Sequence, residues 1–217
     1  MKNTIIWEKM VIEDMKIITS EQIDTLAKRI GKNGEDIRDY LLKEGYIVRI
    51  FKGIFYVLSY DERRRSFPKK SVFYHEMSIY DIVRMALEAK GVKKWYFGLE
   101  TALKMNLMTH EYFTMDFVIT DSFRTTQPID IIGYKYKFFQ WSKWHFQQGI
   151  IKRKGLPFSD KEKTVLDLIY QSHRKGANLD FTLGPYREYH NKIDILKFKK
   201  YLLNYPERFQ RRIEEYL

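Results

Sequence analysis

The segment from Thr19 to Val57 constrains the fold of this chain most, because it carries signals for two closely spaced helices. Thr19 is a favourable N-cap, and Gln22 three residues later completes a capping box, so a helix begins here. After a glycine-containing break, Asn33 can cap a second helix, which Gly45 ends because glycine tolerates positive φ. The sequence therefore predicts two short helices joined by a short turn.

Two β-rich runs follow the second helix directly. They are Tyr46–Phe51 and Ile54–Val57, and the residues between them, Lys52 and Gly53, suit the turn of a tight hairpin. The order of helix, short turn, helix and tight hairpin is that of a winged helix-turn-helix. Such a module reads DNA, so this order predicts a DNA-binding domain.

The candidate DNA contacts lie on the second helix and on the hairpin. The solvent face of the second helix is free to enter a major groove, and the hairpin would lie near phosphates. The candidate residues are Lys32, Asn33, Glu35, Arg38 and Asp39 on the second helix, and Arg49 and Lys52 on the hairpin. The alternative is that these charges are the solvated face of a small domain.

The whole chain is predicted to be α+β, with a winged helix-turn-helix followed by a mixed α+β domain. Residues 1–60 form the predicted DNA-binding domain, and a helix within residues 3–15 supports it. The basic, proline-closed segment at residues 61–73 is the predicted linker, in which Arg63–Arg65 could contact phosphates or remain solvated. Residues 74–217 form the predicted second domain.

Periodicity and turn residues predict the elements of the second domain. A helix is expected within Tyr74–Lys90 and another over Leu99–Met105, and Ser159 with Glu162 forms a second capping box. The predicted strands are Lys94–Phe97, Phe113–Thr120 and a pair formed by Ile129–Gln140 with Trp144–Lys152. A loop over His173–Asn191 precedes two helices near Lys192–Leu203 and Pro206–Tyr216.

Composition bounds the environment and the partners. The chain of 217 residues has a net charge of +11, which favours a polyanionic partner. The first 75 residues carry 15 Lys and Arg against 11 Asp and Glu, so the excess extends into the second half, where an acidic protein or solubility alone would also explain it. Cysteine is absent, no apolar run approaches a membrane span, and no signal peptide is visible, so we expect a cytoplasmic protein.

The sequence offers little catalytic chemistry. The five histidines are dispersed, and no glycine-rich phosphate loop or nucleophile elbow is present, so no cofactor and no metal site are predicted. A metal-dependent nuclease would need carboxylates gathered on adjacent strands. Asp116 and Asp130 lie near the starts of two predicted strands, but no acidic-x-Lys triplet accompanies either of them. We therefore expect a protein that is not an enzyme, with these aspartates capping turns.

Aromatic residues and lysines alternate over Tyr134–Phe146. This composition would suit stacking on single-stranded bases. A half-buried strand pair produces the same pattern, because its aromatic face belongs to the core, and this second interpretation is favoured.

Three segments carry a resemblance to a known family. The run Tyr40–Tyr56 resembles the N-terminal winged helix of the AbiEi-type antitoxins. Tyr96–Leu103, followed by Asn106–Thr109, is similar to the strand-helix entry into the second domain of that family, and Ser159–Leu168 resembles its Glu-Lys/Arg-Thr-Leu-Leu-Asp helix. The segments occur in the family's order and span most of the chain, although the N-terminal helix is longer and the second domain is richer in lysine and aromatic residues.

The resemblance implies a non-enzymatic antitoxin that is also a transcriptional autoregulator. In that family the winged helix binds repeats in the promoter of its own operon, and the second domain is needed to neutralise an AbiEii-type nucleotidyltransferase toxin. The partners would be double-stranded DNA and that toxin, and the resemblance assigns no toxin-binding residues. Two alternatives stay open: a ligand-responsive winged-helix repressor, and a nucleic-acid-processing enzyme whose winged helix delivers substrate.

Overall fold

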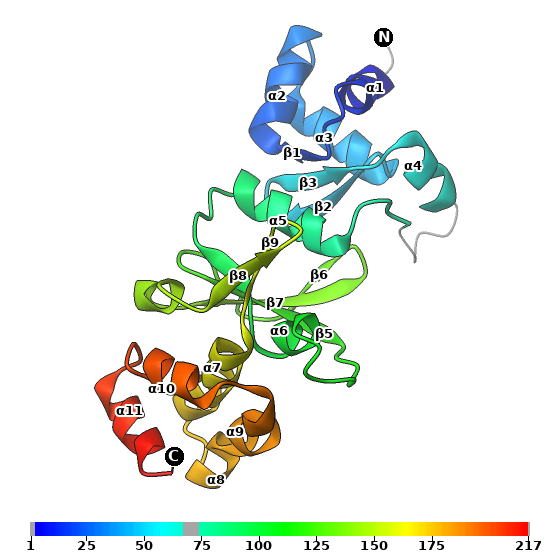
Figure 1. The fold of residues 1–217 in the computed structure, drawn as a ribbon. Helices are drawn as coiled ribbons and strands as arrows, with labels where there is room; N and C mark the ends of the chain where they lie inside the picture. The colour runs from blue at the N-terminus through cyan, green and yellow to red at the C-terminus, as the bar shows by residue number, and fades with distance from the viewer. Residues whose placement is uncertain (1–2, 67–73, 217) are drawn as a thin grey trace. The chain divides into compact units, whose positions relative to one another are not determined.

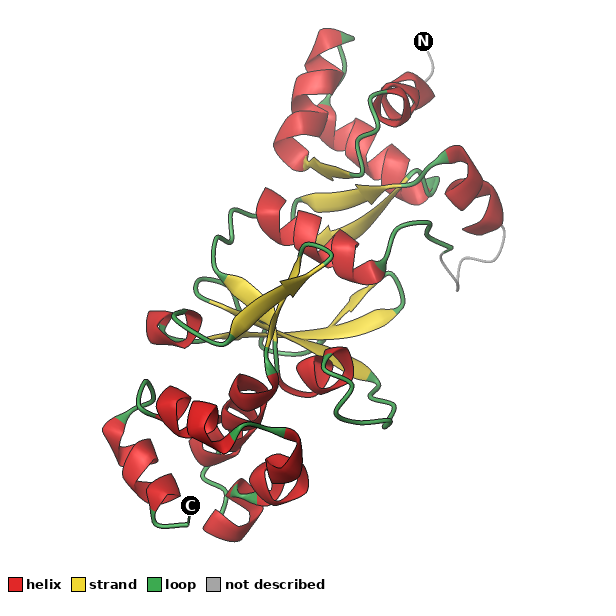
Figure 2. Ribbon diagram, viewed as in Figure 1, coloured by secondary structure: helices red, strands yellow, loops and turns green. Residues whose placement is uncertain are grey.

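A computed structural model describes residues 3–66 and 74–216 of the chain (Figure 1). The predicted α+β class is confirmed, because helices and two sheets occur along the same chain (Figure 2). The chain divides into two compact units. The first unit contains residues 1–93 together with 130–134, and the second unit contains residues 94–129 and 135–217.

The first unit has a three-stranded antiparallel sheet in the order β1-β3-β2. Its elements are α1 (Thr4–Ile12), β1 (Ile17–Thr19), α2 (Ser20–Arg29), α3 (Gly34–Lys43), β2 (Ile47–Phe51), β3 (Ile54–Val57), α4 (Tyr60–Ser66) and α5 (Ile79–Ala89). The predicted helices and hairpin are present at the expected positions. The strand β1 was not predicted from the sequence, because its three residues gain their strand conformation by pairing with β3, far along the chain.

Both faces of this sheet are covered by helices. Phe55 and Val57 of β3 belong to a core cluster formed with residues of α1, α2 and α3. Successive side chains of a strand point to opposite faces, so Ile54 and Tyr56 lie on the other face. The helix α5 contacts all three strands. All four residues of β3 are therefore buried, which explains their continuous apolar sequence.

The N-terminal part of the first compact unit ends at Lys93, and not at the predicted linker over residues 61–73. Residues 60–66 form α4, and the rest of the predicted linker lies outside the described residues. Arg63 is part of the fold, since its guanidinium stacks 4.0 Å from the ring centroid of Tyr46, and Arg64 pairs with Asp61 at 3.1 Å. Because α5 packs on the first sheet, the first unit continues to Lys93 instead of ending at residue 60.

The second unit is built on a mixed sheet, for which the full strand order is β6-β7-β5-β4-β9-β8. The strands of this unit are β4 (Trp95–Phe97), β5 (Met115–Thr120), β7 (Tyr134–Gln140), β8 (Ile150–Arg153) and β9 (Leu156–Ser159). Most of β6 (Ile129–Ile131) falls within residues 130–134, which are counted with the first unit. The pairs β4/β5 and β8/β9 are antiparallel, whereas β5/β7 and β4/β9 are parallel.

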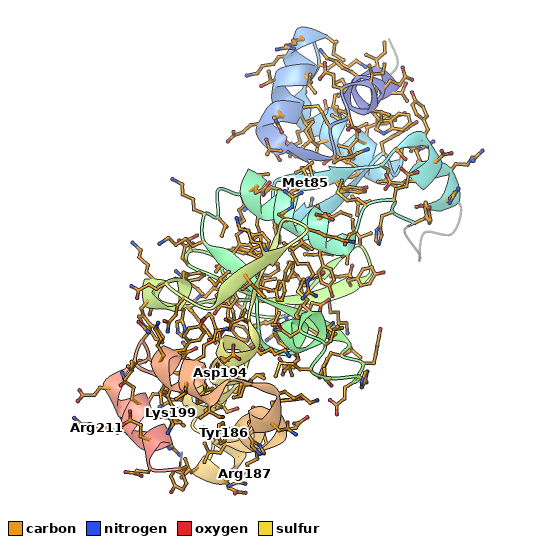
Figure 3. The ribbon with its side chains drawn as sticks, viewed as in Figure 1. Met85, Tyr186, Arg187, Asp194, Lys199 and Arg211 are labelled. Carbon is orange, nitrogen blue, oxygen red and sulfur yellow. The ribbon has the colours of Figure 1, made fainter. Side chains whose placement is uncertain are left out.

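Helices of the second unit pack around α7 (Lys161–Arg174), which supplies Val165, Leu166 and Ile169 to an apolar core. Its other helices are α6 (Leu99–Met105), α8 (Leu179–Thr182), α9 (Gly184–Tyr189), α10 (Ile195–Leu202) and α11 (Glu207–Glu214), with short 3₁₀ turns at Lys143–Phe146 and His190–Lys192. Figure 3 labels Lys199 on α10 and Arg211 on α11, two exposed cations of this helical part.

Two predictions for this unit are wrong. The segment Ile129–Gln140 does not pair with Trp144–Lys152, because β7 pairs with β5 and β8 forms its own hairpin with β9. The predicted loop over His173–Asn191 contains α8 and α9. The core interpretation of Tyr134–Phe146 agrees with the structure, since Tyr136, Phe138, Trp141 and His145 are buried.

Candidate nucleic-acid interface

Side-chain caps and a close glycine contact fix the geometry of the α2–α3 pair. Thr19 and Gln22 form the predicted capping box at the start of α2, with hydrogen bonds of 3.3 and 2.9 Å. The carboxamide oxygen of Asn33 accepts from two backbone N–H groups in the first turn of α3. Gly34 lies so close to α2 that a Cβ atom would be 2.7 Å from the Cα atom of Asp24. The two helices therefore meet at a backbone-to-backbone distance that only glycine permits.

The hairpin is anchored to the start of α2. The backbone N–H of Ser20 donates to the carbonyl of Gly53 at 2.9 Å, and Gly53 adopts φ of 76°, which favours glycine. Lys52 is exposed at the hairpin tip, and Arg49 is exposed on β2. Among the predicted site residues, these two cations are exposed, whereas Lys32 and Arg38 are partly buried.

The side chains of Lys32 and Asn33 are engaged within the first unit. Lys32 donates from its Nζ to Oδ1 of Asn3, and Asn33 uses its oxygen to cap α3. Both predicted contacts thus hold the α2–α3 turn in place. A DNA contact from Asn33 would have to come from its NH₂ group.

The exposed face of α3 is rich in carboxylates. Arg38 pairs with Glu35 at 3.1 Å and lies 3.7 Å from Asp39, and its side chain is only 21% exposed. Asp36 is exposed on the same helix. Carboxylates can accept a hydrogen bond from cytosine N4 in the major groove, but phosphates repel them. Base selection is therefore compatible with this face, whereas phosphate attraction must come from other residues.

A basic group beside the turn was not predicted from the sequence. Lys28 and Arg29 are exposed in the last turn of α2, a few residues before Lys32. Their signal in the sequence is the Lys-Arg pair directly before the glycine break. Because they lie at the C-terminal end of α2, they also interact favourably with the helix dipole, which would explain them without DNA.

A second polar constellation lies inside the second unit, centred on the fully buried Asp167 of α7. Its carboxylate accepts from Tyr96 at 2.8 Å and from Tyr205 at 2.6 Å, and it pairs with Lys163 at 3.2 Å. Burial lowers the pKa of Lys163 and raises the pKa of Asp167, while the charge of each partner opposes the shift of the other. The pair therefore depends on both members being present.

The start of α7 also differs from the prediction. Asp160, and not Ser159, is the N-cap, because its side chain accepts from the backbone N–H of Lys163. Glu162 turns away from the cap to bind Lys197 of α10 at 2.8 Å and the backbone N–H of Asp194. Glu162, which the sequence assigns to a capping box, therefore fastens α10 to α7.

His145 is buried beside this constellation as a neutral ring. It stacks on Trp144 with centroids 3.5 Å apart, and its Nδ1 lies 3.8 Å from the Asp167 carboxylate without a hydrogen bond. Burial, followed by the charges of Lys163 and Arg174, lowers the pKa of His145 to about 2. The folded chain thus keeps this imidazole unprotonated at pH values where an unfolded chain would protonate it.

Because His145 is buried as a neutral ring, the free energy of unfolding decreases as the pH falls. Unfolded His145 takes up a proton near pH 6.5, whereas the folded form does so near pH 2, so stability falls as pH drops below about 6.5. One proton corresponds to a slope of about 1.4 kcal/mol per pH unit. We expect His145→Phe to remove this slope between about pH 4.5 and pH 6.5 in urea titrations followed by tryptophan fluorescence.

The exposed His190 supplies the control for that measurement. His190→Gln should keep the acid dependence of the unsubstituted chain, because its ring is exposed and lies outside the constellation. Parallel curves for His145→Phe and the unsubstituted chain over this pH range would contradict the assignment.

The two aspartates considered for a nuclease site, Asp116 and Asp130, form separate local interactions. Asp116 accepts from Thr101 at 3.0 Å and pairs with Lys104 at 2.6 Å, and Asp130 accepts from the backbone N–H of Gly133 in a turn. Within residues 3–66 and 74–216, no three His, Cys, Asp or Glu side chains are grouped as metal ligands would be. Among the same residues, none of the helices has the length and apolar character needed to cross a membrane.

No protein-family model matches the chain, and no curated protein matches its sequence.

Proposed function

We propose that the first unit is a winged helix-turn-helix that binds double-stranded DNA, and that the protein is a cytoplasmic transcriptional autoregulator and antitoxin. The observation that carries the DNA-binding part is the succession of α2, a glycine-containing turn, α3 and the β2–β3 hairpin, with β1 completing the sheet. Such a succession presents one helix to a major groove and a hairpin to the backbone. Phosphate contacts supply affinity, and α3 supplies sequence choice.

The exposed cations support this arrangement. Lys52 at the hairpin tip and Arg49 on β2 can contact phosphates, and Lys28 and Arg29 can do so at the end of α2. On α3, Glu35 and Asp39 are exposed and the partly buried Arg38 lies beside them, where all three can meet base edges. To contact a base, Arg38 must leave its ion pair with Glu35. The preference for one DNA sequence therefore depends on how well the base replaces that ion pair.

The antitoxin part rests on the resemblance of three segments to the AbiEi-type family. One of these segments, Ser159–Leu168, runs from the end of β9 into α7 and contains the buried Lys163–Asp167 pair. The residues that carry the resemblance in this segment therefore help the second unit to fold, and they do not identify a toxin-binding surface. The partner would be an AbiEii-type nucleotidyltransferase toxin, recognised by surfaces of the second unit that the resemblance does not specify. The protein would have no catalytic activity of its own.

The test is a fluorescence-anisotropy titration of the purified full chain. DNA from upstream of its own gene and a scrambled duplex are compared at two salt concentrations. We expect tighter binding to the upstream DNA that persists at the higher salt. Lys52→Ala should weaken binding to both duplexes equally and reduce the salt slope by about 1, whereas Arg38→Ala should cost about 1–3 kcal/mol on the upstream DNA alone.

Lys199→Ala is the matched control, because it removes an exposed lysine from α10 of the second unit (Figure 3). It should leave both affinities unchanged. If Arg38→Ala and Lys52→Ala are also silent, the docking of α3 and the hairpin on DNA is wrong. Cleavage of DNA or nucleotide transfer by the purified protein with Mg²⁺ would instead favour an enzyme.

A further inference from the structure

The second unit contains two neighbouring hollows of different chemistry. The first, the aromatic hollow, is lined by Leu99, Glu100, Phe117, Phe139 and Leu168 with residues of α7, α8 and α9, and has a volume of about 580 Å³. The second, the cationic hollow, has a volume of about 500 Å³. Both volumes fall within the range of about 300–1,000 Å³ typical of small-molecule sites. Phe139, Gln171 and Lys175 line both hollows, so they adjoin.

The aromatic hollow lies on one face of the sheet. Phe117 of β5 and Phe139 of β7 are half-buried there, with ring planes within 8° of each other and centroids 6.2 Å apart. Both rings pack against the buried cluster of Tyr96, Leu99, Ile119 and Trp141. Two nearly parallel rings supported by this cluster present an apolar surface suited to a flat ring system.

A buried carboxylate oxygen in this hollow accepts no hydrogen bond. Glu100 belongs to the first turn of α6, and its Oε2 is buried without a partner among the described residues. A buried acceptor without a donor is unfavourable, and more so when it is charged. Burial also raises the pKa of Glu100. A ligand that brings an N–H donor to this oxygen would recover that cost.

The cationic hollow carries four positive side chains. They are Arg124, Lys137, Arg174 and Lys175, and none of the described residues that line this hollow is acidic. Lys137 is held in place by a hydrogen bond of 2.8 Å to the carbonyl of Thr125, and Arg174 lies 5.9 Å from the ring centroid of Trp141. Four cations gathered in a lining without an acidic residue suit phosphate groups.

The rim of the aromatic hollow is formed by short helices. Asp180 of α8 pairs with Arg187 of α9 at 2.5 Å, and Phe181 beside Asp180 is 71% exposed (Arg187 is labelled in Figure 3). These residues line the same hollow as Glu100. The opening therefore presents one aromatic ring and an internally neutralised ion pair, with Glu188 beside them and Lys175 on the side shared with the cationic hollow.

From this juxtaposition we propose that the second unit binds a purine nucleotide, with the base in the aromatic hollow and the phosphates in the cationic hollow. The base lies against Phe117 and Phe139 and donates an N–H to Glu100. Arg124, Arg174 and Lys175 bind the phosphates. This site is independent of DNA binding by the first unit.

The probes are ATP, GTP, UTP and inorganic triphosphate, titrated calorimetrically into the full chain in magnesium-free buffer so that the phosphates keep their charge. We expect ATP or GTP to bind at least tenfold more tightly than triphosphate, with UTP between them, because the base adds stacking and one hydrogen bond. Equal affinity for ATP, GTP and triphosphate, or no binding of any probe, would overturn the proposal.

Two substitutions separate the parts of the site. Glu100→Leu should reduce the preference for ATP or GTP over triphosphate to the part that stacking supplies, and should not lower stability, because Oε2 has no partner to lose. Lys175→Ala should weaken all four probes several-fold. Lys199→Ala, outside both hollows, should change nothing. A single-stranded oligonucleotide that binds more tightly than ATP and is displaced by none of the nucleotides would show a nucleic-acid groove instead and overturn the assignment.

Discussion

Replacing Asp167 with alanine is expected to lower the free energy of unfolding of the second unit by about 3–5 kcal/mol, the cost of removing one partner from a buried ion pair. The substitution leaves the ammonium of Lys163 buried without its counter-charge. It also deprives the hydroxyl groups of Tyr96 and Tyr205 of their acceptor. Urea denaturation followed by tryptophan fluorescence measures the effect, because Trp95, Trp141 and Trp144 lie in this unit and only Trp7 lies in the first.

A double substitution separates the charge from the packing. Lys163→Met with Asp167→Leu removes both charges and keeps apolar volume, so we expect it to recover most of the lost stability, as is common when a buried pair is replaced as a whole. Asp167→Asn should fall between the two, since it keeps an acceptor for the tyrosines but not the charge. A double variant as unstable as Asp167→Ala would show that the packing or the tyrosine hydroxyl groups without an acceptor, and not the unpaired charge, set the cost.

This constellation shows what sequence reasoning can and cannot reach. The spacing of Lys163 and Asp167 identifies an i, i+4 pair on a helix. Such pairs usually lie on the surface, and nothing local in the sequence places this one in the core. Its burial arises from Tyr96 and Tyr205, which are 71 and 38 residues away from Asp167 along the chain.

The fold predictions that depend on neighbouring residues are correct, and those that depend on residues far apart along the chain are not. The caps at Thr19 and Asn33 and the turn at Lys52-Gly53 depend on neighbouring residues, and each is present. The pairing of β7 with β5 depends on residues twenty positions apart, and it was predicted wrongly. The helix α5 has a clear apolar face, but periodicity does not say which sheet that face covers.

The candidate site follows this pattern as well. The sequence locates Arg49 and Lys52 on an exposed hairpin, where the structure also has them. It does not reveal that Lys32 is engaged within the first unit, because its partner Asn3 lies 29 residues away along the chain. The adjoining hollows of the second unit combine residues of strands, loops and helices that no local pattern connects.

Gly34→Ala is expected to destabilise the first unit by about 1–3 kcal/mol and to abolish selective DNA binding. The added methyl group would lie 2.7 Å from the Cα atom of Asp24, so α2 and α3 must move apart by a backbone displacement. Rotation of the Asp24 side chain cannot relieve a contact with its main chain. Because α3 is the helix proposed to enter the major groove, a shift of its N-terminal end misplaces Arg38 relative to the bases.

Gly31→Ala provides the matched control in the same turn. Gly31 has φ of 67°, and a Cβ atom there would meet no atom within 4 Å. This substitution should therefore cost about 1–2 kcal/mol of backbone strain without displacing either helix.

The two variants are compared by urea denaturation and by anisotropy titration with the upstream duplex, at a temperature where both remain folded. We expect Gly31→Ala to keep its affinity and its preference over the scrambled duplex, and Gly34→Ala to lose the preference. Equal loss in both variants would mean that DNA binding responds to stability alone, and equal retention would mean that the spacing of α2 and α3 does not determine how α3 is presented.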